Sequence, residues 1–219
     1  MTQVHYFTFS PFAENTYIIY DDTKECIIVD PGCYTPAERD ELSQFISDNA
    51  LTPVRLINTH CHLDHVFGNR YVADTYQLPL EIHEGELPVL NSFPMTVQMY
   101  GIPATQQSPD PDPNKFIKEG DTIRFGNTEL EVRFTPGHSP ASVSFYCANS
   151  NFIIGGDVLF QGSIGRTDLP GGDMDTLMQS IKREFLSLPD NVVVYSGHGN
   201  PTTIGQERKT NPFILQYQL

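Results

Sequence analysis

The sequence predicts an α/β protein in which strands and helices form layers. The first half of the chain contains a strand, a helix and a strand in succession after an opening run of alternating strands, and this order is typical of an α/β arrangement. The second half has similar content, with a meander followed by a helix and a final buried strand. No tandem repeat is visible, so the two halves are alike in content rather than in sequence.

The first half begins with a predicted antiparallel meander, because one alternating run and two further strand-like runs are separated by turn residues. Thr35, Pro36 and Glu38 then form the signature of a capped helix start, which predicts a helix to about Asn49. The predicted strands and helices of this half are, in order, strands 4–9, 15–20 and 25–29, helix 35–49, strand 54–57, helix 66–76 and strand 78–83.

In the second half, two alternating runs flank Gly126-Asn127, which predicts a hairpin. The predicted elements of this half are strands 121–125, 129–134, 142–146 and 151–154, helix 173–187, strand 191–195 and a short helix from about 202 to 208. Between the halves, residues 84–114 carry six prolines. This Pro-rich insertion is either a lid or pocket wall or a stiff surface excursion.

Length and composition predict one cytoplasmic domain spanning residues 1–219. No apolar run approaches the ~20 residues that a membrane span needs, and the N-terminus lacks a secretory signal pattern. The 27 acidic and 13 basic residues give a net charge of −14, which disfavours nucleic acid as a partner. Four scattered cysteines fit a reducing compartment. The sequence carries no signal for the oligomeric state.

The densest chemistry lies between the predicted strand at 54–57 and the next helix, where His60, His62, Asp64 and His65 fall within six positions. Side chains two residues apart in extended backbone point the same way, so His60 and His62 share a direction, and Asp64 and His65 leave in another. Imidazole and carboxylate groups bind zinc. Chance is a poor explanation for such a run, which predicts ligands for two adjacent metal positions.

Three further candidate ligands follow predicted strands, and these are His138, Asp157 and His198. Asp30 also ends a buried strand, and it is either a turn former before proline or an acceptor that orients a metal-bound histidine. Cys61 alternates with the ligands, so we expect it to be a small buried residue that points away. His83 has no partner in sequence and is expected at the surface or behind the site.

The simplest division of the seven candidates gives three ligands to each of two ions and one bridge. One ion would take His60, His62 and His138, the other Asp64, His65 and His198, and Asp157 would bridge them. Ions in such sites lie roughly 3.5–4 Å apart, and a water between them loses a proton near neutral pH. With that hydroxide as nucleophile, Asp64 and Asp157 are the expected catalytic residues. Zinc is the expected metal, with iron and manganese as alternatives.

The run Thr59-His60-x-His62-x-Asp64-His65, with Asp30 before it and three ligands after it, resembles the metallo-β-lactamase-fold hydrolases across nearly the whole chain. The resemblance implies an αβ/βα sandwich of two mixed β-sheets flanked by helices, and it favours the orienting role for Asp30. Asp157 looks like the bridging aspartate of glyoxalase II thioesterases. Residues 165–168 and 197–203 are similar to short bacterial glyoxalase II-like enzymes, which implies a thioesterase acting on S-lactoylglutathione or a related small-molecule thioester.

Alternatives remain open. Residues 165–168 also resemble persulfide dioxygenases, whose single iron would be held by His60, His138 and Asp157. A lactonase, a phosphodiesterase or a non-catalytic metal-binding module on the same fold is also possible. Full-length glyoxalase II proteins have a C-terminal helical domain that contacts glutathione, whereas 21 residues follow His198 here, so glutathione recognition is left open. The candidate carboxylate-binding cations, which are equally surface charges, are Arg166, Arg208 and Lys209.

Overall fold

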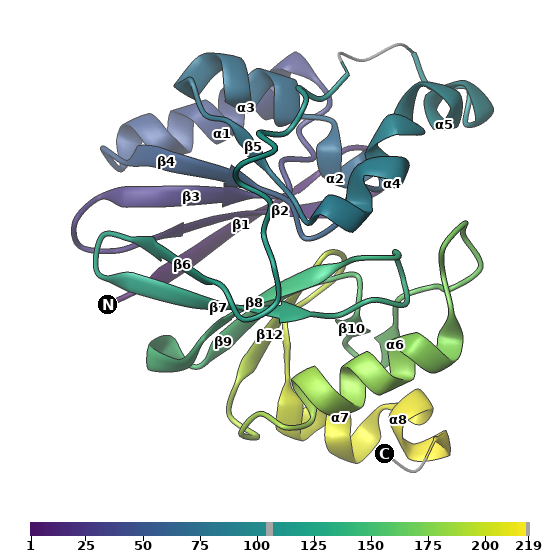
Figure 1. Ribbon diagram of the computed structural model, residues 1–219. Coiled ribbons are helices and arrows are strands. Elements are labelled where there is room, and N and C mark those ends of the chain that lie inside the picture. The colour runs from purple at the N-terminus through teal and green to yellow at the C-terminus, as the bar shows by residue number, and fades with distance from the viewer. Residues whose placement is uncertain (104–106, 218–219) are drawn as a thin grey trace. The chain divides into compact units, whose positions relative to one another are not determined.

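The computed structural model describes residues 1–103 and 107–217, which form two mixed β-sheets flanked by helices (Figure 1). The chain divides into two compact units. The first comprises Met1–Ile117 with Arg124–Glu129, and the second comprises Lys118–Ile123 with Leu130–Leu219. No helix in the described part of the chain is both long and apolar enough to cross a bilayer. The single domain expected from the sequence stays a prediction.

The first unit contains a five-stranded sheet in the order β1-β2-β3-β4-β5. The pairings β1-β2 and β2-β3 are antiparallel, which confirms the predicted meander, and β3-β4 and β4-β5 are parallel. The elements of this unit are β1 (Gln3–Phe9), β2 (Glu14–Tyr20), β3 (Glu25–Val29), α1 (Pro36–Asp48), β4 (Thr52–Ile57), α2 (Leu63–Val66), α3 (Asn69–Tyr76), β5 (Leu80–Glu81), η1 (Glu84–Glu86), α4 (Leu87–Asn91) and α5 (Phe93–Met99).

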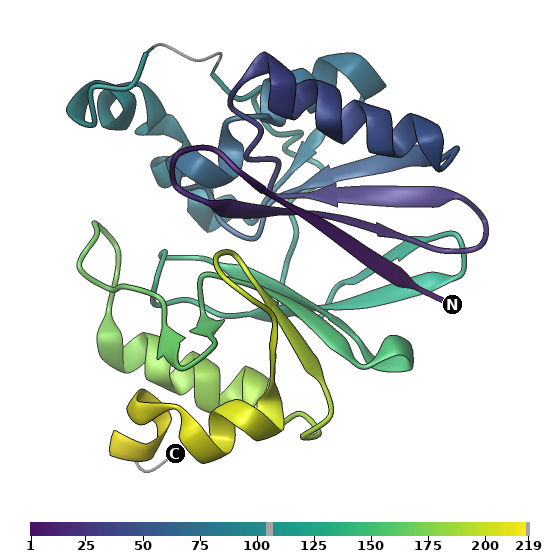
Figure 2. The same ribbon diagram turned by 180° about the vertical axis from the view of Figure 1, so that it is seen from behind.

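Helices α1 and α3 lie against one face of this sheet (Figure 2). The predicted capping box is confirmed, because the Thr35 side chain accepts from the Glu38 backbone N–H and the Glu38 side chain accepts from the Thr35 N–H. Leu42 and Ile46 of α1 are buried with Val72 of α3 in one apolar core. This core fixes the helices on the sheet whose strand ends carry the chemistry.

The proline-rich insertion is more regular than its composition suggests. Pro88 and Pro94 stand in the first turns of α4 and α5, where a helix needs no N–H donor and the fixed φ of proline fits. Two of the six prolines therefore start helices instead of breaking them. Within the range 84–114, residues 104–106 lie outside the described part of the chain.

The first unit also contains the hairpin tip Arg124–Glu129. The Asn127 N–H and the Thr128 hydroxyl donate to the Asp21 carboxylate at 2.7 and 2.8 Å, and Thr23 donates to the same side chain from its N–H and hydroxyl. Burial alone would raise the pKa of Asp21, but these four hydrogen bonds lower it to about 2.

The second unit is built on a six-stranded sheet in the order β13-β12-β9-β8-β7-β6 and a two-stranded sheet of β10 and β11. Its sheets and helices are β6 (Thr122–Phe125), β7 (Thr128–Phe134), β8 (Val143–Cys147), β9 (Phe152–Gly156), β10 (Leu159–Phe160), β11 (Ser163–Ile164), α6 (Met174–Ser180), a π-helical turn η3 (Ile181–Phe185), β12 (Val193–Ser196), β13 (Thr202–Thr203), α7 (Ile204–Thr210) and α8 (Pro212–Gln216). Strands β10 and β11 were not predicted, because two-residue strands leave no periodic pattern.

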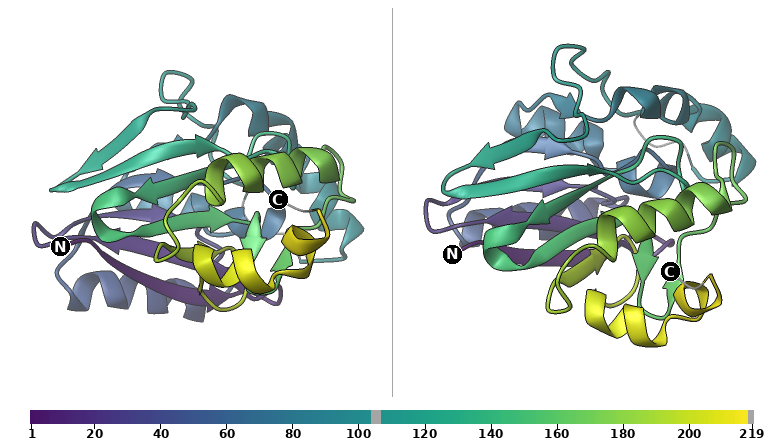
Figure 3. Two further views of the ribbon diagram at one scale, coloured as in Figure 1. Left: turned by 90° about the horizontal axis from the view of Figure 1, so that it is seen from below. Right: turned by 60° about the horizontal axis from the view of Figure 1, so that its bottom comes forward.

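Helices α6 and α7 lie over the strands of this second sheet (Figure 3). The predicted helix at 173–187 is confirmed as α6 followed by η3, and its apolar face contributes Leu177 and Phe185 to the core of the unit. Strand β12 runs parallel to β9. Their carboxyl ends therefore meet at one edge, and that edge carries Asp157 and His198.

Candidate metal centre

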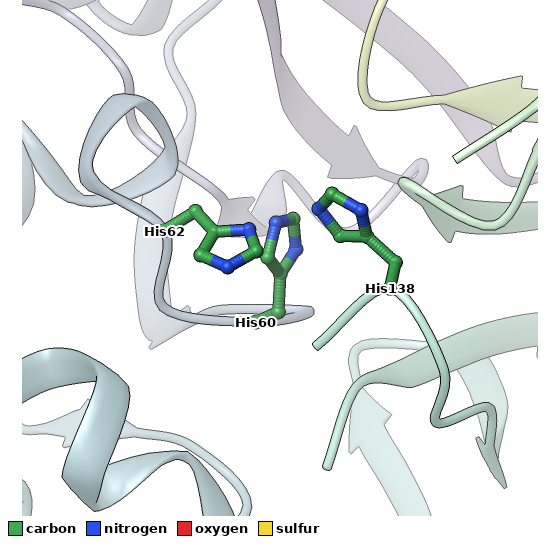
Figure 4. Close-up of side chains that lie close together, drawn as sticks. All are labelled: His60, His62 and His138. Atoms are coloured by element: carbon green, nitrogen blue, oxygen red, sulfur yellow. The ribbon is translucent and has the colours of Figure 1, made fainter. Parts of the chain in front are cut away.

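The predicted ligand run occupies the loop after β4 and the first turn of α2. His62 is the residue before α2, and Asp64 and His65 lie inside its first turn. The His60 and His62 ring centroids are 4.8 Å apart, and the His60 and His65 centroids are 4.0 Å apart. Figure 4 shows the His60 and His62 side chains on their shared loop, and His138 on its loop in the second unit. Within the first unit, the run brings three imidazoles together.

Asp30, directly after β3, accepts hydrogen bonds from the residues that lead into this run. Its Oδ1 accepts from the Thr59 N–H at 2.7 Å and the Asn58 Nδ2 at 3.2 Å, and its Oδ2 accepts from the Thr59 hydroxyl at 2.5 Å. The His65 Nδ1 lies 3.1 Å from the same Oδ2. Because a carboxylate accepts, this hydrogen bond places the His65 proton on Nδ1 and makes Nε2 the candidate ligand nitrogen.

Two further features mark Asp30 as part of the site. Its φ of 50° is left-handed, a conformation that a side chain other than glycine adopts at a cost. It also belongs to a group with His60 and His65 in which one nitrogen or carboxylate oxygen from each residue lies within 4.8 Å of the others. The structure thus places the Asp30 carboxylate against the His65 imidazole, where an orienting acceptor has to lie. The same residue also forms the turn before Pro31.

Glu14 is a site residue that the sequence analysis missed. It is fully buried at the start of β2, its Oε2 accepts from the Thr16 hydroxyl at 2.9 Å, and its Oε1 lies 3.9 Å from the His65 Nδ1. Burial raises the pKa of Glu14 well above its ordinary value. The available signal was polar Glu14-Asn15-Thr16 opening a strand that is otherwise apolar.

The predicted position of Cys61 is confirmed. The side chain is buried, burial raises the pKa of its thiol well above the ordinary value, and its backbone N–H donates to the Glu86 Oε2 at 2.9 Å. Glu86, itself fully buried in η1, therefore fixes the loop between the His60 and His62 ligands. His83 caps η1 through its Nδ1, which accepts from the Gly85 N–H.

The second unit contributes a separate group of candidate ligands. Asp157 follows β9, and its Oδ2 lies 3.4 Å from the His138 Nε2 and 3.5 Å from the His198 Nε2. The His138 Nδ1 donates to the Arg166 carbonyl at 2.7 Å, which makes its Nε2 the candidate ligand nitrogen. His138, Asp157 and His198 lie on three different loops, and the fold brings their side chains together around the Asp157 carboxylate.

Gly165 makes the Arg166 contact possible. A Cβ at this position would lie 1.9 Å from the Asp157 carbonyl oxygen and 3.3 Å from the His138 Cβ. Only glycine lets the backbone pass so close to two candidate ligands. The phrase Gly165-Arg166-Thr167-Asp168 therefore has a packing role at the site.

The three candidate substrate-binding cations are all in the second unit. The Arg166 guanidinium makes two hydrogen bonds of 2.7 Å to Asp168, and this pairing holds the pKa of the Asp168 carboxyl at about 2. Arg208 on α7 pairs with Asp190 at 3.1 Å and also donates to the Leu188 carbonyl. Lys209 is exposed in the last turn of α7. The guanidinium groups of Arg166 and Arg208 therefore already donate hydrogen bonds to acceptors within the second unit.

The donor chemistry in both units fits divalent metal ions. Imidazole nitrogens with their opposite nitrogen hydrogen-bonded, together with carboxylate oxygens, are the ligands of zinc, iron and manganese sites. The first unit offers His60, His62, Asp64 and His65, and the second offers His138, Asp157 and His198.

Known proteins resemble this chain along nearly its whole length. A profile of the Metallo-beta-lactamase superfamily matches residues 10–198. A Bacillus subtilis protein described as probable metallo-hydrolase YqgX is 38% identical over 212 residues, covering 95% of this chain and 96% of its own length. A Haemophilus influenzae protein described as hydroxyacylglutathione hydrolase GloC is 36% identical over 205 residues, covering 93% of each chain.

Two crystal structures extend the likeness to three dimensions. The BLEG-1 B3 metallo-beta-lactamase has a TM-score of 0.87 and 37% identity, with 97% of this chain and 99% of that chain covered. TTHA1623 in a di-iron-bound form has a TM-score of 0.84 and 34% identity, with 95% and 99% covered. These matches confirm the predicted fold class, two mixed β-sheets flanked by helices.

Proposed function

Since this chain belongs to the metallo-beta-lactamase superfamily and is a metallo-hydrolase by that membership, we propose that it is a thioesterase of the glyoxalase II type. Its substrate would be S-lactoylglutathione or a related small-molecule thioester. The relative described as hydroxyacylglutathione hydrolase GloC supports this choice. All four cysteines are free and buried, which fits the cytoplasmic location that we also propose.

The observation that carries the proposal is Asp157, whose single Oδ2 is approached by both the His138 and the His198 Nε2 atoms. An oxygen shared in this way suits a carboxylate that bridges two ions. We propose that His60 and His62 join His138 at one ion, and that Asp64 and His65 join His198 at the other.

When bound, two divalent ions would activate water and polarise the acyl carbonyl. The chain's own residues set up that chemistry. Asp30 and the Arg166 carbonyl fix the tautomers of His65 and His138, so that both histidines present Nε2. Glu86 holds the loop that carries His60. These contacts orient the ligands before any metal arrives, which lowers the cost of forming the site.

Recognition of the glutathione carboxylates would fall to Arg166, Arg208 or Lys209, of which Arg166 stands nearest in sequence to the ligands. Its guanidinium is bound to Asp168, so a substrate carboxylate has to displace that partner. An Asp168→Asn variant should then bind an anionic thioester more tightly than the native enzyme does.

Metal analysis joined to a thioester assay tests the proposal. We expect about two divalent ions per chain, hydrolysis of S-lactoylglutathione without oxygen uptake, and loss of turnover in His62→Ala. The matched control is His5→Ala, which removes an imidazole stacked on Phe45. Near-normal hydrolysis by His62→Ala refutes the assignment. A single iron with oxygen consumption on glutathione persulfide instead supports the persulfide dioxygenase alternative at His60, His138 and Asp157.

A further inference from the structure

Two partly buried aromatic side chains of the first unit, Phe12 and Tyr34, pack on the buried Phe67, and the exposed Tyr100 packs on Phe12. The Phe67 ring centroid lies 6.1 Å from that of Phe12 and 5.0 Å from that of Tyr34. Tyr100, which is 48% exposed, meets the Phe12 ring edge-on with centroids 5.9 Å apart. We call Phe12, Tyr34 and Tyr100 the aromatic wall.

The aromatic wall contacts the segment that directly follows the ligand run, because Phe12 and Tyr34 both pack on Phe67. Phe67 follows α2, two residues after His65, and Tyr34 stands four residues after Asp30. Phe93 of α5 also packs on Phe67, with ring centroids 6.2 Å apart. Through Phe67, the aromatic wall borders the helix α2, which carries Asp64 and His65.

One carboxylate positions two members of the wall. The Glu38 Oε1 accepts from the Ser10 N–H at 2.7 Å, and its Oε2 accepts from the Tyr34 N–H at 2.8 Å and the Thr35 N–H at 2.7 Å. The turn carrying Phe12 is therefore tied to the loop carrying Tyr34 through the start of α1.

The turn that presents Phe12 is also strained. Ser10 and Ala13, on either side of Phe12, have φ values of 62° and 53°, a left-handed conformation that is costly for residues other than glycine. The Ala13 N–H donates to the Ser10 carbonyl and the Phe12 N–H donates to the Ser10 hydroxyl. The backbone and the side chain of Ser10 therefore both hold the turn that carries Phe12.

The adjoining segment offers no cation to an anionic group. Residues 87–100, which include α4 and α5, contain no charged residue. A glutathione carboxylate would find no partner there. An uncharged apolar group would find aromatic rings, which bury large apolar areas with few rotatable bonds.

We propose that the aromatic wall binds an uncharged apolar acyl or aryl group of the substrate thioester. This inference rests on the proposed thioesterase function and adds the class of substrate. The acyl group lies against Phe12 and Tyr34, and the metal centre holds the thioester carbonyl.

A matched pair of thioesters tests the inference: phenylacetyl and acetyl thioesters of the same uncharged thiol, N-acetylcysteamine. We expect Phe12→Leu and Tyr34→Leu to lower kcat/KM for the phenylacetyl ester about tenfold, mainly through KM, with less than a twofold change for the acetyl ester. Leucine keeps apolar volume, so the fold is retained. The control is Met95→Ala, which removes a 65% exposed apolar side chain of α5.

A binding measurement keeps this inference separate from the proposed function. Uncharged ketone analogues, in which a methylene replaces the thioester sulfur, are titrated calorimetrically into zinc-loaded protein. A phenylacetyl preference that Phe12→Leu abolishes supports the wall even where no thioester is hydrolysed, and in that case only the thioesterase proposal fails. Equal binding of both analogues, or a dimer that Phe12→Leu dissociates without changing either Kd, overturns the inference.

Discussion

Replacing Asp30 by asparagine should weaken metal binding without changing the size of the side chain. Each carboxylate oxygen of Asp30 serves two groups, with Oδ1 taking the Thr59 N–H and the Asn58 amide and Oδ2 taking the Thr59 hydroxyl and facing the His65 Nδ1. Asparagine has one oxygen, so its NH₂ group must face one of these pairs. If it faces His65, the imidazole loses the acceptor that fixes its tautomer.

The expected magnitude follows from that lost contact. Partners of this kind are typically worth 10–100-fold in metal affinity, or about 1.4–2.8 kcal/mol at 1.4 kcal/mol per tenfold. A buried donor left without an acceptor also lowers the free energy of unfolding by about 1–3 kcal/mol. Both effects should appear together, because the same atoms cause them.

Zinc affinity is measured by competition with a chromophoric chelator, and stability by thermal melting of the same metal-free preparations. The matched control is Asp40→Asn on the exposed side of α1, which should leave both values unchanged. Zinc affinity of Asp30→Asn within twofold of native would show that Asp30 does not orient His65, even if the variant melts earlier.

Three other outcomes are expected. The lowered pKa of Asp21 stabilises the fold above the unfolded pKa of 3.8, and this contribution is lost as the pH falls toward about 2. Urea unfolding should show Asp21→Asn less stable than native by about 1–2 kcal/mol at pH 6, after allowance for solvent screening, and a difference that persists at pH 2 would contradict this. Glu38→Ala should lower the free energy of unfolding by about 1–2 kcal/mol, because the helix cap is lost. Denaturant unfolding measures the change, and Glu41→Ala is the control that keeps the cap. Burial raises the pKa of the Cys26 and Cys33 thiols to about 12, so both should stay protonated and resist alkylation at pH 8 in native protein. Mass spectrometry measures the modification, and rapid alkylation would show that these thiols are not buried.

Local patterns in the sequence predicted the frame of the site. The Thr35 to Glu38 signature predicted the start of α1, and the prediction that the ligand run begins after a strand and ends at a helix is confirmed by β4 and α2, although α2 starts at Leu63 and so contains His65. Both depend on residues close together in the chain, where periodicity and capping chemistry act. The family resemblance and the fold class are likewise confirmed.

The supports of the site were not predictable in the same way. Glu14 acts near His65 across 51 positions, and Glu86 reaches Cys61 across 25. Contacts of this range leave no spacing signature, because tertiary packing and not local backbone geometry creates them. The role of Pro88 and Pro94 was also hidden, since proline starts a helix as readily as it ends one.

The Glu38 carboxylate has more than one duty, since it begins a helix and also tethers two neighbouring loops. Any change that frays the opening turn of α1 would release both loops at once. The stability of the fold and the choice of acyl group therefore depend on the same side chain. Directed evolution toward bulkier molecules would then have to relax this tether or work around it. Selecting variants by thermal stability alone would retain Glu38 and, with it, the original substrate preference.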